Sequence, residues 1–94
     1  MVVYICFCKM TSDFLKKPIE EREQIIPQWM ELGKKHGLKT LTYGNPTGVN
    51  ENVVIMFQSK KYSDNYMKFQ REWLGLGSPE AHKFVEHTRT ITVH

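Results

Sequence analysis

The chain has 94 residues, of which 40% are hydrophobic and 24% charged, and its formal net charge is +3. This length fits one globular domain, residues 1–94, and leaves no room for a second. The positive charge comes from scattered lysine pairs and not from a dense basic stripe, so nucleic-acid binding is not favoured. A domain this small buries only about 60–65% of its unfolded surface, so self-association would add substantially to its stability.

The first segment, Val2 to Met10, is rich in β-branched and aromatic residues and predicts a strand. It is far shorter than the roughly 20 apolar residues that cross a bilayer. It also has no positive flank of the kind that opens a signal peptide, so we expect no membrane association. Residues 11–17 are expected to form a loop.

Cys6 and Cys8 would lie on one face of this strand about 6.5–7 Å apart, a spacing that is poor for a disulfide. With no other cysteine in the chain, we expect a reduced, intracellular and therefore cytoplasmic protein. The alternative is a soft-metal or redox role, but two thiolates supply only half of a tetrahedral zinc site. Buried structural cysteines are the favoured interpretation.

A helix is expected from Pro18, a residue favoured at the first helical position, to His36. Gly37 follows and can take the left-handed conformation that terminates helices. Pro27 cannot donate a backbone hydrogen bond, so a kink or a break is expected near Gln24. The residues expected to pack on a sheet fall within one arc of the helix: Ile19, Ile25, Ile26, Trp29, Met30, Leu32 and Gly33.

The rest of the chain predicts a hairpin, two helices and a last strand. Strands 38–43 and 52–58 flank a turn cluster, residues 45–48. A second helix, capped by Ser59 or Ser63, carries an apolar stripe: Tyr62, Tyr66, Phe69, Trp73 and Leu76. A short third helix starts at residues 78–80 and carries Ala81, His82, Phe84 and Val85. In the last strand, Arg89, Ile91 and Val93 alternate with threonines.

This order of elements predicts an α+β domain with a four-stranded antiparallel sheet and its helices on one face. In a sheet with one wet face, polar and apolar residues alternate, yet segments 2–8 and 53–57 are apolar throughout. Helices can bury one set of these side chains, and only a partner can bury the other. The sequence therefore predicts a homodimer formed through the free face of the sheet.

Two stretches resemble a known superfamily. One is Arg22-x4-Pro27-x4-Leu32-x4-Gly37 with a following strand that ends in Tyr43-Gly44, and the other is Trp73-Leu74 followed by Ser78-Pro79-Glu80-Ala81-His82. Together with the element order, they are similar to the dimeric α+β barrels, which include the antibiotic-biosynthesis monooxygenase, stress-responsive barrel, muconolactone isomerase and YciI-like families. The resemblance implies two ferredoxin-like βαββαβ subunits that join their sheets into a barrel, with ligands between sheet and helices.

Members of that superfamily include cofactor-free oxygenases, haem-degrading oxygenases, isomerases, dehydratases and proteins without known activity, so membership does not imply an enzyme. Isomerase-like proton transfer needs a general base and an orienting hydroxyl. His82, His87 and Tyr43 are the candidates for these catalytic roles. His36 is a candidate for substrate binding, although a histidine in the last helical turn also suits a structural capping role.

Arg22 projects from the apolar side of its helix, where a guanidinium at the mouth of a pocket would suit a carboxylate or enolate. The alternative is that the Pro27 kink turns it into solvent. Tyr66 and Trp73 are candidates to wall a pocket for a flat aromatic ligand, although aromatic residues at helical spacing commonly form plain core.

Haem-degrading members use an Asn on the first strand, a Trp on the second helix and a His further along. Trp73 and His82 stand nine positions apart, but the first strand has Cys6, Phe7 or Cys8 where the Asn would be. A haem-binding or haem-degrading protein is therefore the least favoured alternative, and we expect no cofactor and no metal. The sequence predicts a homodimer that binds a small apolar or aromatic molecule in a helix–sheet cleft, as a cofactor-independent monooxygenase or isomerase if it is an enzyme. The alternative is a non-catalytic dimeric domain.

Overall fold

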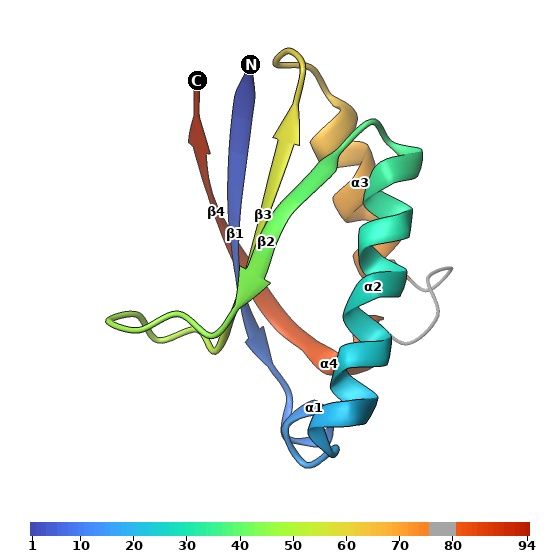
Figure 1. The fold of residues 1–94 in the computed structure, drawn as a ribbon, viewed down its shortest axis with the longest axis vertical. Helices are drawn as coiled ribbons and strands as arrows, with labels where there is room; N and C mark the ends of the chain where they lie inside the picture. Colours follow the sequence, from blue (N-terminus) through green and yellow to red (C-terminus); the bar gives the residue numbers. More distant parts are fainter. Residues whose placement is uncertain (76–80) are drawn as a thin grey trace.

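The structure, a computed structural model, describes residues 1–75 and 81–94. The described elements are β1 Val2–Met10, α1 Ser12–Leu15, α2 Ile19–Lys35, β2 Lys39–Gly44, β3 Val53–Ser59, α3 Asn65–Leu74, α4 Ala81–Phe84 and β4 Val85–Val93. The strands form one antiparallel sheet in the order β2-β3-β1-β4, and the helices lie on one side of it (Figure 1). The fold is therefore α+β and ferredoxin-like, as predicted. None of the described helices is long and apolar enough to cross a membrane.

The C-terminal end of α2 follows the predicted chemistry. Gly37 has a φ of 77°, a left-handed conformation that costs glycine little. Its N–H donates to the carbonyl of Lys34 at 3.0 Å, and the Leu38 N–H donates to Gly33 at 2.9 Å. These two hydrogen bonds give partners to backbone carbonyls that the end of the helix would otherwise leave without one. It also turns Leu38 into the core, where its side chain is fully buried.

Two sequence expectations near α2 are wrong. The break near Gln24 does not occur, because α2 continues through Pro27 as one helix of 17 residues. Pro27 is exposed, so the carbonyl that it leaves without a partner is on the solvent side, where water can hydrate it. Residues 11–17 are not all loop, since α1 forms there and buries Phe14 against the rings of Trp29 and Phe84.

The second helical segment is shorter than predicted. Helix α3 begins at Asn65, whose N–H donates to the Ser63 hydroxyl at 3.3 Å, and Tyr62 precedes it with an exposed ring. Its buried stripe is Tyr66, Phe69 and Trp73. Leu76 and the expected start of the third helix at 78–80 lie outside the described residues. Val85 begins β4 and does not continue α4.

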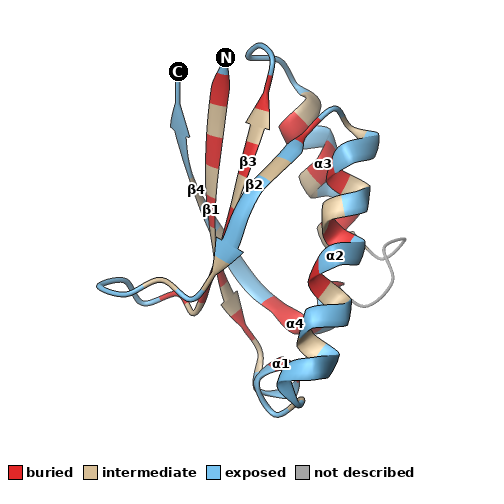
Figure 2. Cartoon of the chain, in the orientation of Figure 1, coloured by how far each residue is buried: buried red, intermediate tan, exposed pale blue. Residues whose placement is uncertain are grey.

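The two faces of the sheet differ in what covers them. Buried and intermediate residues alternate along β1 and β3 and form alternating bands on both strands (Figure 2). The buried set includes Cys6, Ile55 and Phe57, and the Phe57 ring packs against Phe69 of α3. The opposite face, called the open face below, carries apolar side chains from three strands: Val3, Ile5, Phe7, Val54, Met56, Ile91 and Val93. Within one chain Ile91 and Val93 are 45% and 49% exposed. The predicted two-faced apolar sheet is thus present, with one face uncovered in the single chain.

The connection between β2 and β3, residues 45–52, extends away from the sheet on the side opposite the helices (Figure 1). We call it the arm. At its base the Arg89 guanidinium donates two hydrogen bonds to the Glu51 carboxylate, at 2.9 and 3.0 Å, and lies 4.6 Å from the ring centroid of Phe7. This ion pair holds the pKa of Glu51 at about 2. The arm is therefore tied to the open face at its root.

Candidate functional site: a cleft between helix α2 and the sheet

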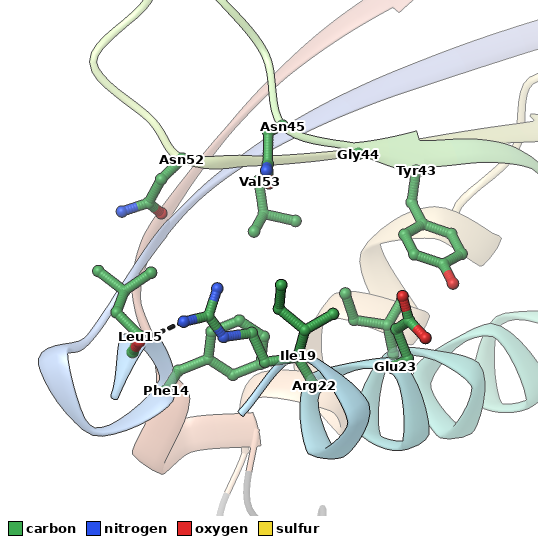
Figure 3. A pocket seen from close by; sticks show the side chains of 11 residues that line it. Phe14, Leu15, Ile19, Arg22, Glu23, Tyr43, Gly44, Asn45, Asn52 and Val53 are labelled. Carbon is green, nitrogen blue, oxygen red and sulfur yellow. Dashed lines mark hydrogen bonds between the residues drawn. The ribbon is translucent and has the colours of Figure 1, made fainter. Parts of the chain in front are cut away.

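A cleft of about 210 Å³ lies between the start of α2 and the junction of β2 with β3 (Figure 3). Its apolar lining is Phe14, Leu15, Ile19, Ile26 and Val53, and its polar lining is Arg22, Glu23, Tyr43, Asn45 and Asn52. Ligand pockets usually measure about 300 Å³ or more, so this cleft suits a small ligand of about one ring. Arg22 and Tyr43, two of the residues singled out from sequence, line it together.

Two local features bring these side chains together. Arg22 shares the face of Ile19 and Ile26, at helical spacings of three and four residues. In β2 the register shifts between Thr40 and Thr42, so that Tyr43 pairs with Ile55 and lies on the helix side of the sheet. Without this bulge, strict alternation from Thr40 would have placed Tyr43 on the open face.

The Arg22 guanidinium connects α2 to the segment before it. Its Nε donates to the carbonyl of Lys17 at 3.0 Å, and its Nη2 donates to the carbonyl of Leu15. Its Cζ lies 5.8 Å from the centroid of the Phe14 ring. Guanidinium has five N–H groups, so donors remain for a ligand. Figure 3 shows the group inside the cleft, across from Val53 and Asn52. The alternative that Arg22 turns into solvent does not describe this structure.

Three polar residues of the cleft were not singled out from sequence as site residues. Glu23 follows Arg22 on α2 and points toward the same region as Tyr43 (Figure 3). Asn45 and Asn52 are the first and last residues of the arm. The Asn52 Oδ1 accepts a hydrogen bond from the Met10 N–H at 2.8 Å, which fixes this side chain beside the cleft. The position of Asn45 and Asn52 at the two ends of the connection between the predicted strands could have pointed to them, because the ends of a hairpin connection lie close together at one edge of the sheet.

Tyr66 and Trp73 belong to other parts of the molecule. The Tyr66 ring stacks on Tyr4 with centroids 4.3 Å apart, and its hydroxyl lies 2.7 Å from the Thr90 Oγ1. It lines a smaller groove of about 140 Å³ between α3 and β4. Trp73 is 0% exposed and packs against the rings of Trp29 and Phe69, so it is a core residue. Neither is among the described residues that line the α2 cleft.

The three candidate histidines, His36, His82 and His87, do not lie together at one site. His36 ends α2, and its Nε2 lies 2.5 Å from the Glu72 carboxylate of α3, a contact that lowers the pKa of Glu72 below its ordinary value. His82 is exposed on α4, and His87 is exposed on β4 opposite Lys9. None of the three is among the described lining residues of the cleft. Among residues 1–75 and 81–94, no group of three or more His, Cys, Asp or Glu is arranged to hold a metal ion.

Comparison with known proteins defines the fold. An uncharacterized NIPSNAP domain protein from Burkholderia xenovorans superimposes with a TM-score of 0.60 and 16% identity, over 100% of this chain and 93% of that one. A dimeric protein of unknown function and ferredoxin-like fold from Bacteroides fragilis NCTC 9343 gives 0.51 and 16%, over 99% and 94%. No protein-family model and no curated protein matches the chain. At this identity the likeness shows the ferredoxin-like fold, and the narrower families named above stay predictions.

Proposed function

We propose that this chain forms a homodimeric α+β barrel that binds a small, mainly apolar or aromatic molecule with an acidic group in the α2 cleft. The observation that carries the proposal is the Arg22 guanidinium, which lies in a cleft whose other walls include Phe14, Ile19 and Ile26. A charged donor beside apolar side chains favours a ligand that brings both a hydrocarbon body and an anionic end.

The cleft can satisfy both ends of such a ligand. The N–H groups of Arg22 that Leu15 and Lys17 leave free can donate to a carboxylate or an enolate oxygen. A flat ring can pack on the Phe14 ring and the Ile26 side chain, which are buried at the cleft floor. The volume of about 210 Å³ limits the ligand to about one substituted ring.

The dimer is proposed to form through the open face. Phe7, Val54 and Met56 belong to a continuous apolar surface on three strands, and burial of such surface contributes about 25 cal/mol per Å². The arm extends on the same side, where a second sheet would lie (Figure 1). The Bacteroides fragilis protein, which shares the fold, is described as dimeric. A symmetric pairing would bury the same residues of both copies.

An enzymatic role is proposed only for proton transfer by groups that line the α2 cleft. Tyr43 and Glu23 line the same cleft, so a hydroxyl and a carboxylate are available to hold or move a proton on a bound enol. A cofactor-independent isomerase or monooxygenase would therefore depend on these two groups, since His82 and His87 lie elsewhere. The free, buried cysteines suit a reducing compartment such as the cytoplasm.

Paired probes test the ligand class by calorimetric titration. Benzoate and benzamide have the same ring and nearly the same shape, and only benzoate carries a charge. A charge-assisted hydrogen bond contributes about 1.5–3 kcal/mol, so benzoate should bind about 10- to 150-fold more tightly than benzamide. Arg22→Met should remove this preference, whereas Arg71→Met, which changes an exposed arginine of α3, should keep it.

Arg22 also holds the backbone before α2, so its replacement can disturb the cleft itself. Benzamide affinity serves as the internal control, because it reports the shape of the cleft without the charge. Equal affinities for the acid and the amide in the wild-type chain would contradict the proposed ligand class. A preference for benzoate that survives Arg22→Met would contradict the role of this residue.

A further inference from the structure

The groove between α3 and β4, which shares no described lining residue with the α2 cleft, contains a hydrogen-bonded network with unused groups. The Gln70 Nε2 donates to the Tyr66 hydroxyl at 3.1 Å and to the Thr88 Oγ1 at 3.4 Å. Both amide protons are thereby engaged, so the Gln70 Oε1 remains as an acceptor. The Tyr66 and Thr90 hydroxyls lie 2.7 Å apart and share one hydrogen bond. Two hydroxyls carry two protons, so one proton of this pair remains for a ligand.

Tyr4 adds a buried hydroxyl to the wall of the same groove. Its side chain is 2% exposed, and its oxygen has no hydrogen-bond partner among residues 1–75 and 81–94. Burial raises the pKa of Tyr4, an effect that the nearby Ser63 N–H partly offsets, so the hydroxyl keeps its proton near neutral pH. A buried hydroxyl that cannot donate its proton costs folding free energy. A ligand that accepts this proton would recover part of that cost.

The outer wall of the groove consists of exposed side chains. Tyr62 and Met67 line the groove and are 64% and 54% exposed. The Tyr62 ring packs against the exposed ring of His94, with centroids 5.0 Å apart. Tyr62 is also close enough to Tyr4 to contribute to the raised pKa of Tyr4, after burial. Rotation of the Tyr62 ring would therefore open the Tyr4 hydroxyl to the groove.

The lining of the groove disfavours charged and large ligands. None of the described residues that line it has a charged side chain, so an ion would lose hydration there without gaining a counter-charge. The volume of about 140 Å³ is less than half of the roughly 300 Å³ at which pockets for drug-sized ligands begin. The groove therefore suits an uncharged molecule of about three or four carbon atoms.

We propose that the groove between α3 and β4 binds a small neutral polyol through adjacent hydroxyl groups. Each hydroxyl both donates and accepts, so two neighbouring hydroxyls can accept protons from Tyr4 and Thr90 and donate one to the Gln70 Oε1. The C–H groups between them can pack on the Tyr62 ring and the Met67 side chain. This site is independent of the α2 cleft, where a guanidinium favours an anion.

Paired probes test the site by titration of the full chain, followed through backbone amide chemical shifts. Erythritol and 1,4-butanediol share a four-carbon chain, and only erythritol has the two inner hydroxyls. Two net neutral hydrogen bonds correspond to about 5- to 150-fold in affinity, so erythritol should bind more tightly by this factor. Its saturable shifts should concentrate at Tyr66, Gln70 and Thr90. Erythronate, the carboxylate relative of erythritol, should bind more weakly than erythritol because no cation lines the described groove.

Variants that keep the shape of the groove test the assigned groups. Tyr4→Phe and Thr90→Val each remove one hydroxyl and should each reduce the preference for erythritol about 2- to 12-fold. Thr47→Val, at an exposed position of the arm, should keep it. Without ligand, Tyr4→Phe should melt no lower than the wild type, because the lost hydroxyl has no partner among the described residues. A lower melting temperature would overturn the role of Tyr4.

Two results would overturn the proposal as a whole. One is equal affinity of the wild-type chain for erythritol and 1,4-butanediol, or shifts that do not saturate with either. The other is an erythritol preference that survives in both Tyr4→Phe and Thr90→Val. Benzoate binding in the α2 cleft is measured separately, so its failure would leave the polyol result standing.

Discussion

Replacement of Val54 by Asp separates the stability of one chain from that of the proposed dimer. Val54 lies on the open face of the central strand β3, opposite Phe7 of β1 and Gly44 of β2, and is half-buried in the single chain. An aspartate there would keep contact with water in a monomer. The cost to the monomer is then limited to weaker strand propensity and packing, about 1 kcal/mol.

The cost to the proposed dimer is much larger. A symmetric interface presents position 54 twice, and each buried, unpaired charge costs about 3–5 kcal/mol. Two carboxylates at about 3 kcal/mol each give about 6 kcal/mol, and each 1.4 kcal/mol changes an equilibrium constant tenfold. Val54→Asp should therefore weaken dimerisation by at least about 10⁴-fold.

Size-exclusion chromatography with light scattering measures this effect. The wild-type chain should give about twice its mass of 11.1 kDa, and Val54→Asp should give 11.1 kDa with an unchanged circular dichroism spectrum. Ile55→Asp is the matched control, because the neighbouring side chain is 0% exposed beneath the helices and its replacement should unfold the chain. A folded Val54→Asp chain of dimeric mass, or a monomeric wild type at micromolar concentration, would refute the reasoning.

Three further changes have defined outcomes. Gly37→Ala should lower the free energy of unfolding by about 1 kcal/mol, because the φ of Gly37 is positive. Gly44→Ala should leave this free energy unchanged, because an added Cβ meets open space there, and urea unfolding measures both variants. Leu38→Ala should cost about 2–5 kcal/mol in the same assay. The pKa of Glu51 falls to about 2 when folded, so its contribution to stability is complete above about pH 4.3 and is lost as pH falls toward 2. Melting temperatures in this range should fall less in Glu51→Gln than in the wild type, and equal slopes would exclude the Arg89 pair as a source of acid sensitivity.

The fold could be predicted because its signals are local and repeated. The unbroken apolar runs in β1 and β3 predicted a sheet with apolar side chains on both faces, and the termination of α2 followed from one glycine, Gly37. The order of elements then left few ways to arrange four strands. Helix α1 was missed because a single turn gives no periodicity, and Phe14 becomes part of the core only through contacts with distant rings.

The site was harder to predict because it depends on register. Arg22 could be found from its place among apolar side chains, but the bulge in β2 that puts Tyr43 beside it has no signal in the sequence. The histidines were grouped because they are chemically alike. His36 instead contacts Glu72, and the start of β4 at Val85 carries His87 onto a strand, away from the cleft.

Backbone amide chemical shifts during a benzoate titration test most directly whether the α2 cleft is the binding site. Saturable shifts should concentrate at the residues around the cleft, with Arg22, Tyr43 and Asn52 among the largest. Tyr66 and Gln70, in the groove between α3 and β4, should stay nearly unchanged. Shifts that fail to saturate, or that concentrate at Tyr66 and Gln70, would contradict the assignment of this cleft.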